Sequence, residues 1–233
     1  MITTGKGKEP LRSAWSVTKN DVECAKPYWN YEDIGIFFLV PVFLGSVLRL
    51  LVRFHLLPRS ELSDPSVGLQ SAVTASLSLT LYLVLKLRHH QPVLRPLGWI
   101  WPRTAYIVVA LIGGILLAAS VALYLHLRQR SMPPITVTEL ILFGLLLGPV
   151  LEESFFRGCL LPVLAQTTGS RIAVIVTSML FAVFHQPADG AHWVSFTATG
   201  LAYGWIRVSS RSTAAAAIMH ATYNLTVFLS AMC

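Results

Sequence analysis

The sequence has 233 residues, of which 54% are hydrophobic and 12% are charged, and its mean hydropathy is +0.62. Soluble domains usually have about a quarter of their residues charged, so this composition excludes an ordinary soluble protein. The 18 lysines and arginines, within a formal net charge of +7, are spread over connecting segments and form no basic run with interleaved aromatics. We therefore expect the lipid bilayer as the main partner and no nucleic acid.

Charge distribution divides the chain into three parts. Residues 1–33 are polar before any apolar run begins, so we expect a cytoplasmic tail and an uncleaved first anchor rather than a signal peptide. Residues 34–132 should form the N-terminal transmembrane helices. Residues 133–233 should form a transmembrane core that contains the polar motifs described below. Three isolated cysteines indicate no disulfide framework: Cys24, Cys159 and Cys233.

Apolar windows predict about seven to eight membrane-spanning helices of roughly 20 residues each. The expected fold class is therefore all-α, a polytopic transmembrane helical bundle. Turn residues and the interfacial pair Trp99 and Trp101 separate the windows. The predicted spans are 34–54, 68–87, 104–127, 136–162, 170–186, 191–208 and 212–231.

The distribution of lysine and arginine predicts the orientation. With seven spans and the N-terminus inside, twelve of these residues fall in inside segments and five in outside segments. The positive-inside rule then favours a cytoplasmic N-terminus. The same count places Glu152 near mid-membrane but His185 toward the outer end of its span. These two depths disagree unless one of the two helices is shifted or broken.

A polar cluster interrupts the fourth predicted span. Glu152, Glu153 and Arg157 stand in an otherwise apolar run, although a carboxylate near a bilayer centre costs about 2.5–3.5 kcal/mol on insertion scales. Glu153 and Arg157 are one helical turn apart, so they share a face and can pair. Glu152 points about 100° away and is left available to the bundle interior. A purely structural buried network is the alternative.

Two other spans carry polar groups at helical spacing. Phe181 and His185 end the fifth span one turn apart, and His220 and Asn224 stand one turn apart in the seventh. Taken alone, a histidine at a helix end is often interfacial, and a His–Asn pair can simply hold helices together. Together with a glutamate, these groups can activate water and stabilise an oxyanion.

The sequence contains no signature of covalent catalysis. It has no GxSxG nucleophile elbow and no HExxH zinc motif. Ser154 has no histidine or lysine at an obvious spacing. Glu, His, His and Asn on three apolar helices therefore predict activation of water by a carboxylate.

The three motifs resemble those of the CAAX protease and bacteriocin-processing family, also called the Abi family, which includes CAAX prenyl protease 2-like intramembrane endopeptidases. The family motifs EExxxR, FxxxH and HxxxN read here as residues 152–157, 181–185 and 220–224, in the same order. The resemblance covers roughly residues 136–229.

The resemblance implies an all-helical membrane core and a glutamate-dependent endopeptidase. It implies that Glu152 is the general base and that His185 positions the water or passes a proton to the leaving amine. It also implies that His220 and Asn224 stabilise the oxyanion. Three residues would support the site structurally: Glu153, Arg157 and Phe181.

The resemblance does not fix the substrate, which we expect to be a peptide or protein, in or at the membrane. No cofactor is expected. A metal-dependent peptidase with Glu152, His185 and His220 as zinc ligands is the first alternative, and a non-catalytic membrane scaffold of the same fold is the second. A short chain without a eukaryotic targeting segment indicates a bacterial protein, and hence the bacterial inner membrane.

Overall fold

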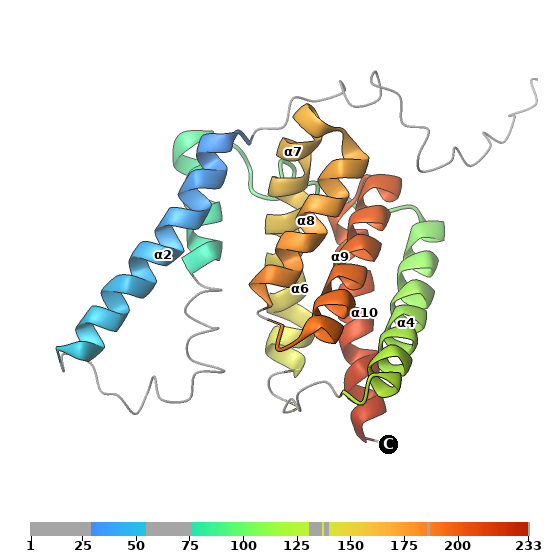
Figure 1. The fold of residues 1–233 in the computed structure, drawn as a ribbon. Coiled ribbons are helices and arrows are strands. Elements are labelled where there is room, and N and C mark those ends of the chain that lie inside the picture. The colour runs from blue at the N-terminus through green and yellow to red at the C-terminus, as the bar shows by residue number, and fades with distance from the viewer. Residues whose placement is uncertain (1–28, 55–75, 131–136, 138–139, 186, 233) are drawn as a thin grey trace, which may run out of the picture.

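The structure is a computed structural model that describes residues 29–54, 76–130, 137, 140–185 and 187–232. Every regular element in this part of the chain is helical, which confirms the all-α prediction. Most helices run side by side as a bundle, and α2 (Tyr31–Arg53) stands to one side of it (Figure 1). The predicted tail up to residue 28, and the first part of the second span, lie outside the described residues.

The helices follow the apolar windows. The second predicted span appears as a helix at residues 76–83 that continues into π-helical η2 (Val84–Arg88). The later spans, apart from the fourth, are α4 (Thr104–Leu127), α8 (Ser170–Phe184), α9 (Gly190–Ser210) and α10 (Thr213–Met232). Among the described helices, α4 alone is both long and apolar enough to cross a membrane, while α8 is apolar but shorter. The expected seven to eight spans are therefore not confirmed.

The fourth predicted span is longer and less regular than predicted. Pro149 and Pro162 stand at the starts of two of its α-helical segments. Proline has no backbone N–H, so in a π-helical register the carbonyl five residues earlier has no backbone donor. The segments, in order, are η3 (Leu140–Leu147), α6 (Gly148–Glu153), η4 (Ser154–Leu160) and α7 (Leu161–Thr168).

Side chains from two other helices bond the carbonyls that these prolines leave free. Asn224 on α10 donates from Nδ2 to the carbonyl oxygen of Gly144 at 2.8 Å. Arg207 on α9 donates from Nε to the carbonyl oxygen of Arg157 at 3.2 Å. Each carbonyl lies five residues before a proline. The irregular helix is thus tied to its neighbours at two levels.

Two glycines allow α7, α8 and α9 to pack closely. Gly169 alone joins α7 to α8, with φ of +80°, a conformation that other residues rarely adopt. On α9, a Cβ at Gly200 would lie 2.9 Å from the Cα of Ser178. A side chain at position 200 would therefore push α8 and α9 apart and disturb the face that carries the polar residues.

Candidate active site

Glu152 and His185 face each other from different helices. Glu152 Oε2 lies 3.7 Å from His185 Nε2, and His185 Nδ1 lies 2.8 Å from the carbonyl oxygen of Phe181. Because a carbonyl can only accept, Nδ1 carries a hydrogen, and in the neutral ring Nε2 presents its lone pair to Glu152. Two acceptors at this separation can be bridged by one water molecule that donates to both.

The hairpin through Gly169 explains why these two residues meet. Glu152 and His185 lie at nearly equal sequence separations on either side of Gly169, and α7 and α8 pack against each other. The short α8 therefore ends beside the middle of the long irregular helix. Both side chains reach the same level of the bundle, although the span count had predicted different depths.

The Glu152 side chain is partly exposed, whereas one of its carboxylate oxygens is buried. The Glu152 side chain is 31% exposed and that of His185 is 26% exposed. Yet Glu152 Oε2 itself is buried and has no hydrogen-bond partner among the described residues. One carboxylate oxygen thus points inward beside the histidine, while the residue remains reachable from outside.

Glu153 is the hub of a buried polar group. Its Oε1 accepts from Arg157 Nη1 at 3.1 Å, as the spacing predicted, and from His220 Nδ1 at 3.0 Å. The Glu153 and Arg157 side chains have no exposed surface, and His220 is 6% exposed. Arg157 also donates from Nη2 to the carbonyl oxygen of Gly200 at 2.9 Å. Adjacent glutamates therefore have different surroundings.

Aromatic rings hold the two histidines. The Phe181 ring lies 4.3 Å from the His185 ring and 5.9 Å from the His220 ring, and the Arg157 guanidinium lies 4.8 Å from its centroid. Tyr203 stacks on His220 at 4.7 Å with an interplanar angle of 19°. The FxxxH phenylalanine thus contacts members of all three motifs.

Asn224 lies one turn beyond His220, as predicted, and its side-chain amide is hydrogen bonded. One N–H is bonded to Gly144, which leaves a second N–H on the same nitrogen. The oxyanion role of Asn224 stays a prediction, because the bond to Gly144 is by itself structural.

Sequence reasoning missed several residues of the site. Trp99, predicted to be interfacial, donates from Nε1 to Ser154 Oγ at 2.8 Å beside Glu153, whereas Trp101 is 79% exposed as an interfacial residue would be. Tyr203 and Tyr223 are also buried in the site. No sequence spacing marks these side chains, because their partners lie on other helices.

Asp189 fixes the chain just after His185. Its Oδ1 accepts from the backbone N–H groups of Ala191 and His192, and Oδ2 accepts from Arg130 Nε at 2.5 Å. The backbone and side-chain hydrogen bonds of His192, with a smaller contribution from Arg130, hold the pKa of Asp189 below its usual value. Asp189 is therefore an ionised N-cap for α9 at neutral pH.

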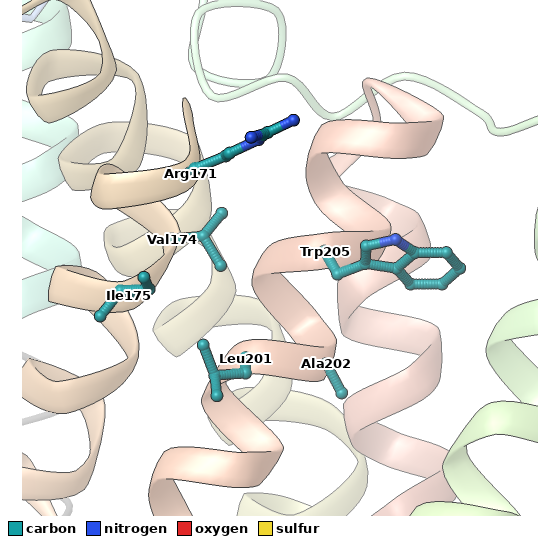
Figure 2. Close-up of a pocket in the computed structure, with 6 residues that line it drawn as sticks. All are labelled: Arg171, Val174, Ile175, Leu201, Ala202 and Trp205. Atoms are coloured by element: carbon teal, nitrogen blue, oxygen red, sulfur yellow. The ribbon is translucent and has the colours of Figure 1, made fainter. Parts of the chain in front are cut away.

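A separate groove lies between α8 and α9 (Figure 2). It is apolar apart from an arginine at one end, Arg171, which stands in the first turn of α8, whereas His185 follows the last. No residue of the predicted site lines it. The lining residues are Arg171, Val174, Ile175, Leu201, Ala202 and Trp205.

The alternative zinc set is not assembled as a cluster. Within the described part of the chain, no three or more His, Cys, Asp or Glu side chains are grouped so that they could hold a metal ion. His220 directs Nδ1 at Glu153 instead.

Residues 134–226 match the model of the Rce1-like family, described as type II CAAX prenyl endopeptidase. This range contains all three motifs, so the family resemblance is confirmed. The family description names a prenyl endopeptidase, and the matched range covers less than half of the chain. No curated protein and no solved structure matches the chain.

Proposed function

We propose that this protein is an intramembrane endopeptidase that hydrolyses a peptide bond with water activated by Glu152 and His185. The observation that carries the proposal is the approach of Glu152 Oε2 to His185 Nε2, at 3.7 Å, with the ring held by its bond to Phe181. A positioned general base contributes about 10²–10⁴ to the rate of such a reaction.

In the proposed reaction, water held between the two side chains gives a proton to Glu152 while its oxygen bonds to the peptide carbonyl carbon. The carbonyl oxygen becomes the oxyanion of a tetrahedral intermediate. His185 Nε2 takes this proton from Glu152 and passes it to the amide nitrogen as the C–N bond breaks, which restores the Glu152 carboxylate. The products are a carboxylic acid and an amine, and no covalent enzyme intermediate forms.

His220 and Asn224 are the proposed oxyanion donors. His220 bonds Glu153 through Nδ1, so its Nε2 is the nitrogen left to donate when the ring carries both hydrogens. The carboxylate of Glu153 offsets that positive charge. Asn224 donates through the N–H that is not bonded to Gly144. Losing one such donor typically costs about 10²–10³ in rate.

The proposed substrate class is a peptide or protein in or at the membrane. A prenylated CaaX tail is the form that the family description names. The geometry of Glu152 and His185 requires only an amide carbonyl and a leaving amine, so the proposal does not depend on a prenyl group.

The test compares membranes from cells that express the wild type or Glu152→Gln, with new protein termini quantified by mass spectrometry. Termini present with the wild type and absent with Glu152→Gln are expected. Glu32→Gln is the matched control, because Glu32 is an exposed glutamate outside the site, and it should give the wild-type set. Identical termini with the wild type and Glu152→Gln would contradict the proposal.

A further inference from the structure

Buried polar atoms without a hydrogen-bond partner among the described residues lie on Glu152 and on residues near it. Buried side-chain polar atoms in proteins nearly always have a partner, which is either protein or ordered water. Here five such atoms, all on neighbouring residues, have none among the described residues. They are Glu152 Oε2, Glu153 Oε2, Arg157 Nε and the hydroxyls of Tyr203 and Tyr223.

The contacts among these residues show that they form one compact cluster. Arg157 is bonded to Glu153 and its guanidinium lies 5.4 Å from the Tyr203 ring centroid. The Tyr203 and Tyr223 rings lie 6.5 Å apart at 76°. Tyr203 also stacks on His220, which is hydrogen bonded to Glu153. Four helical segments, α6, η4, α9 and α10, converge here.

The two hydroxyls are the cluster members that can both donate and accept. Tyr203 is 1% exposed and Tyr223 is 6% exposed, so bulk water does not solvate them in this structure. Stacking on His220 fixes the Tyr203 ring and with it the direction of its hydroxyl. A buried water needs two to four polar partners, and this cluster supplies donors and acceptors together.

We propose that this cluster is an internal water-binding site, held by the Tyr203 and Tyr223 hydroxyls and the Glu153–Arg157 pair, that feeds the hydrolytic water to Glu152. Hydrolysis inside a bilayer consumes water where lipid supplies none, so a store beside the base meets that need. The delivery of water rests on the proposed function, whereas its binding does not. Tyr203 and Tyr223 are thus positioning residues for water.

Radiolytic footprinting of the full chain in lipid nanodiscs tests the binding, because hydroxyl radicals formed from bound water oxidise the nearest side chains. Phe181 and Phe155 are a matched pair of buried phenylalanines, 1% and 5% exposed. Phe181 contacts Tyr203, whereas Phe155 packs among Phe37, Phe156 and Phe184. We expect Phe181 to be oxidised several-fold faster, with the label taken from ¹⁸O-water.

The double variant Tyr203→Phe/Tyr223→Phe keeps both rings and removes both hydroxyls. It should lower oxidation at Phe181 to the level of Phe155, while Tyr124→Phe on α4 leaves it unchanged. Equal oxidation of Phe181 and Phe155 in the wild type would overturn the proposal. Oxidation of Phe181 at the wild-type rate in the double variant would also overturn it, because the label would then come from solvent that enters beside Glu152.

Steady-state kinetics test the delivery of water separately from its binding. On a substrate found by the membrane comparison, the double variant should lower kcat and leave KM unchanged, and an unchanged kcat would overturn the delivery step. Footprinting needs no substrate. If Glu152→Gln left protein termini unchanged, the proposed function would fail while the footprint could still show the water site.

Discussion

The carboxylate of Glu153 and the imidazole of His220 are hydrogen bonded at 3.0 Å, although 67 residues separate them in the chain. The same carboxylate oxygen accepts from Arg157. One buried acid therefore joins the first motif to the third. Its neighbour Glu152 lies beside the second motif, and its Oε2 has no hydrogen-bond partner in the described part of the chain. Substitutions of Glu152 and Glu153 should therefore have different effects on activity and stability.

Glu153→Gln should lower folded yield and melting temperature more than activity per folded molecule. The substitution leaves the Arg157 guanidinium, which has no exposed surface, without its counter-charge. Removing one partner of a buried ion pair costs about 3–5 kcal/mol. Thermal melting in detergent, followed by size-exclusion chromatography, measures the effect, with exposed Glu32→Gln as the control. A wild-type melting temperature for Glu153→Gln would contradict the role of Glu153 as a hub.

Asn224→Ala and Arg207→Met remove equivalent bonds to carbonyls that Pro149 and Pro162 leave free. Both should therefore lower stability, because an unpaired buried carbonyl costs about 1–3 kcal/mol. Only Asn224→Ala should also reduce kcat, by about 10²–10³ and with little change in KM, because only Asn224 is proposed to donate to the oxyanion. Steady-state kinetics separate the two, and equal kcat values would leave Asn224 a structural residue.

Activity should survive prolonged chelation, and purified protein should contain less than one equivalent of metal. If Glu152 ligated zinc, Glu153 would be the remaining nearby acid, and it is already bonded to Arg157 and His220. Metallopeptidases with HExxH keep a separate glutamate as base. Metal analysis with activity before and after chelation measures this. Stoichiometric zinc, with activity lost on chelation and restored by zinc alone, would favour the metal-dependent alternative.

Residue spacing predicted contacts within a helix but not contacts between helices. The Glu153–Arg157 pair and the contact between Phe181 and His185 were foreseen, because residues four apart share a helix face. The bonds Glu153–His220 and Trp99–Ser154 were not. Periodicity says which side of a helix is polar, yet which helices then meet depends on turns such as Gly169 and on close approaches such as Gly200.

The helix boundaries were likewise predicted only in part. Most apolar windows became helices at nearly the predicted residues, but the fourth runs on to Thr168 with two π-helical segments. The positions of Pro149 and Pro162 in the sequence show where backbone N–H donors are missing. The donors that replace them, Asn224 and Arg207, lie far along the chain. Only the packed structure shows that these residues complete the irregular helix.

The predicted orientation puts residues 88–103 in the cytoplasm. Leu94 is the position to label, because it is 64% exposed, whereas Leu97 is 1% exposed and would resist a reagent on either side. In a background with Cys24, Cys159 and Cys233 replaced by alanine, Leu94→Cys should resist an impermeant thiol reagent in intact cells and react after lysis. Prompt labelling of intact cells would reverse the orientation.

Turnover by purified Glu152→Gln in lipid vesicles shows whether Glu152 is the base. The substrate is a protein identified by the membrane comparison, and a melting temperature equal to that of the wild type shows that the variant is folded. We predict that kcat falls by at least about 10²–10⁴, because the carboxamide cannot take the proton of water. Wild-type turnover by folded Glu152→Gln would show that Glu152 is not the base.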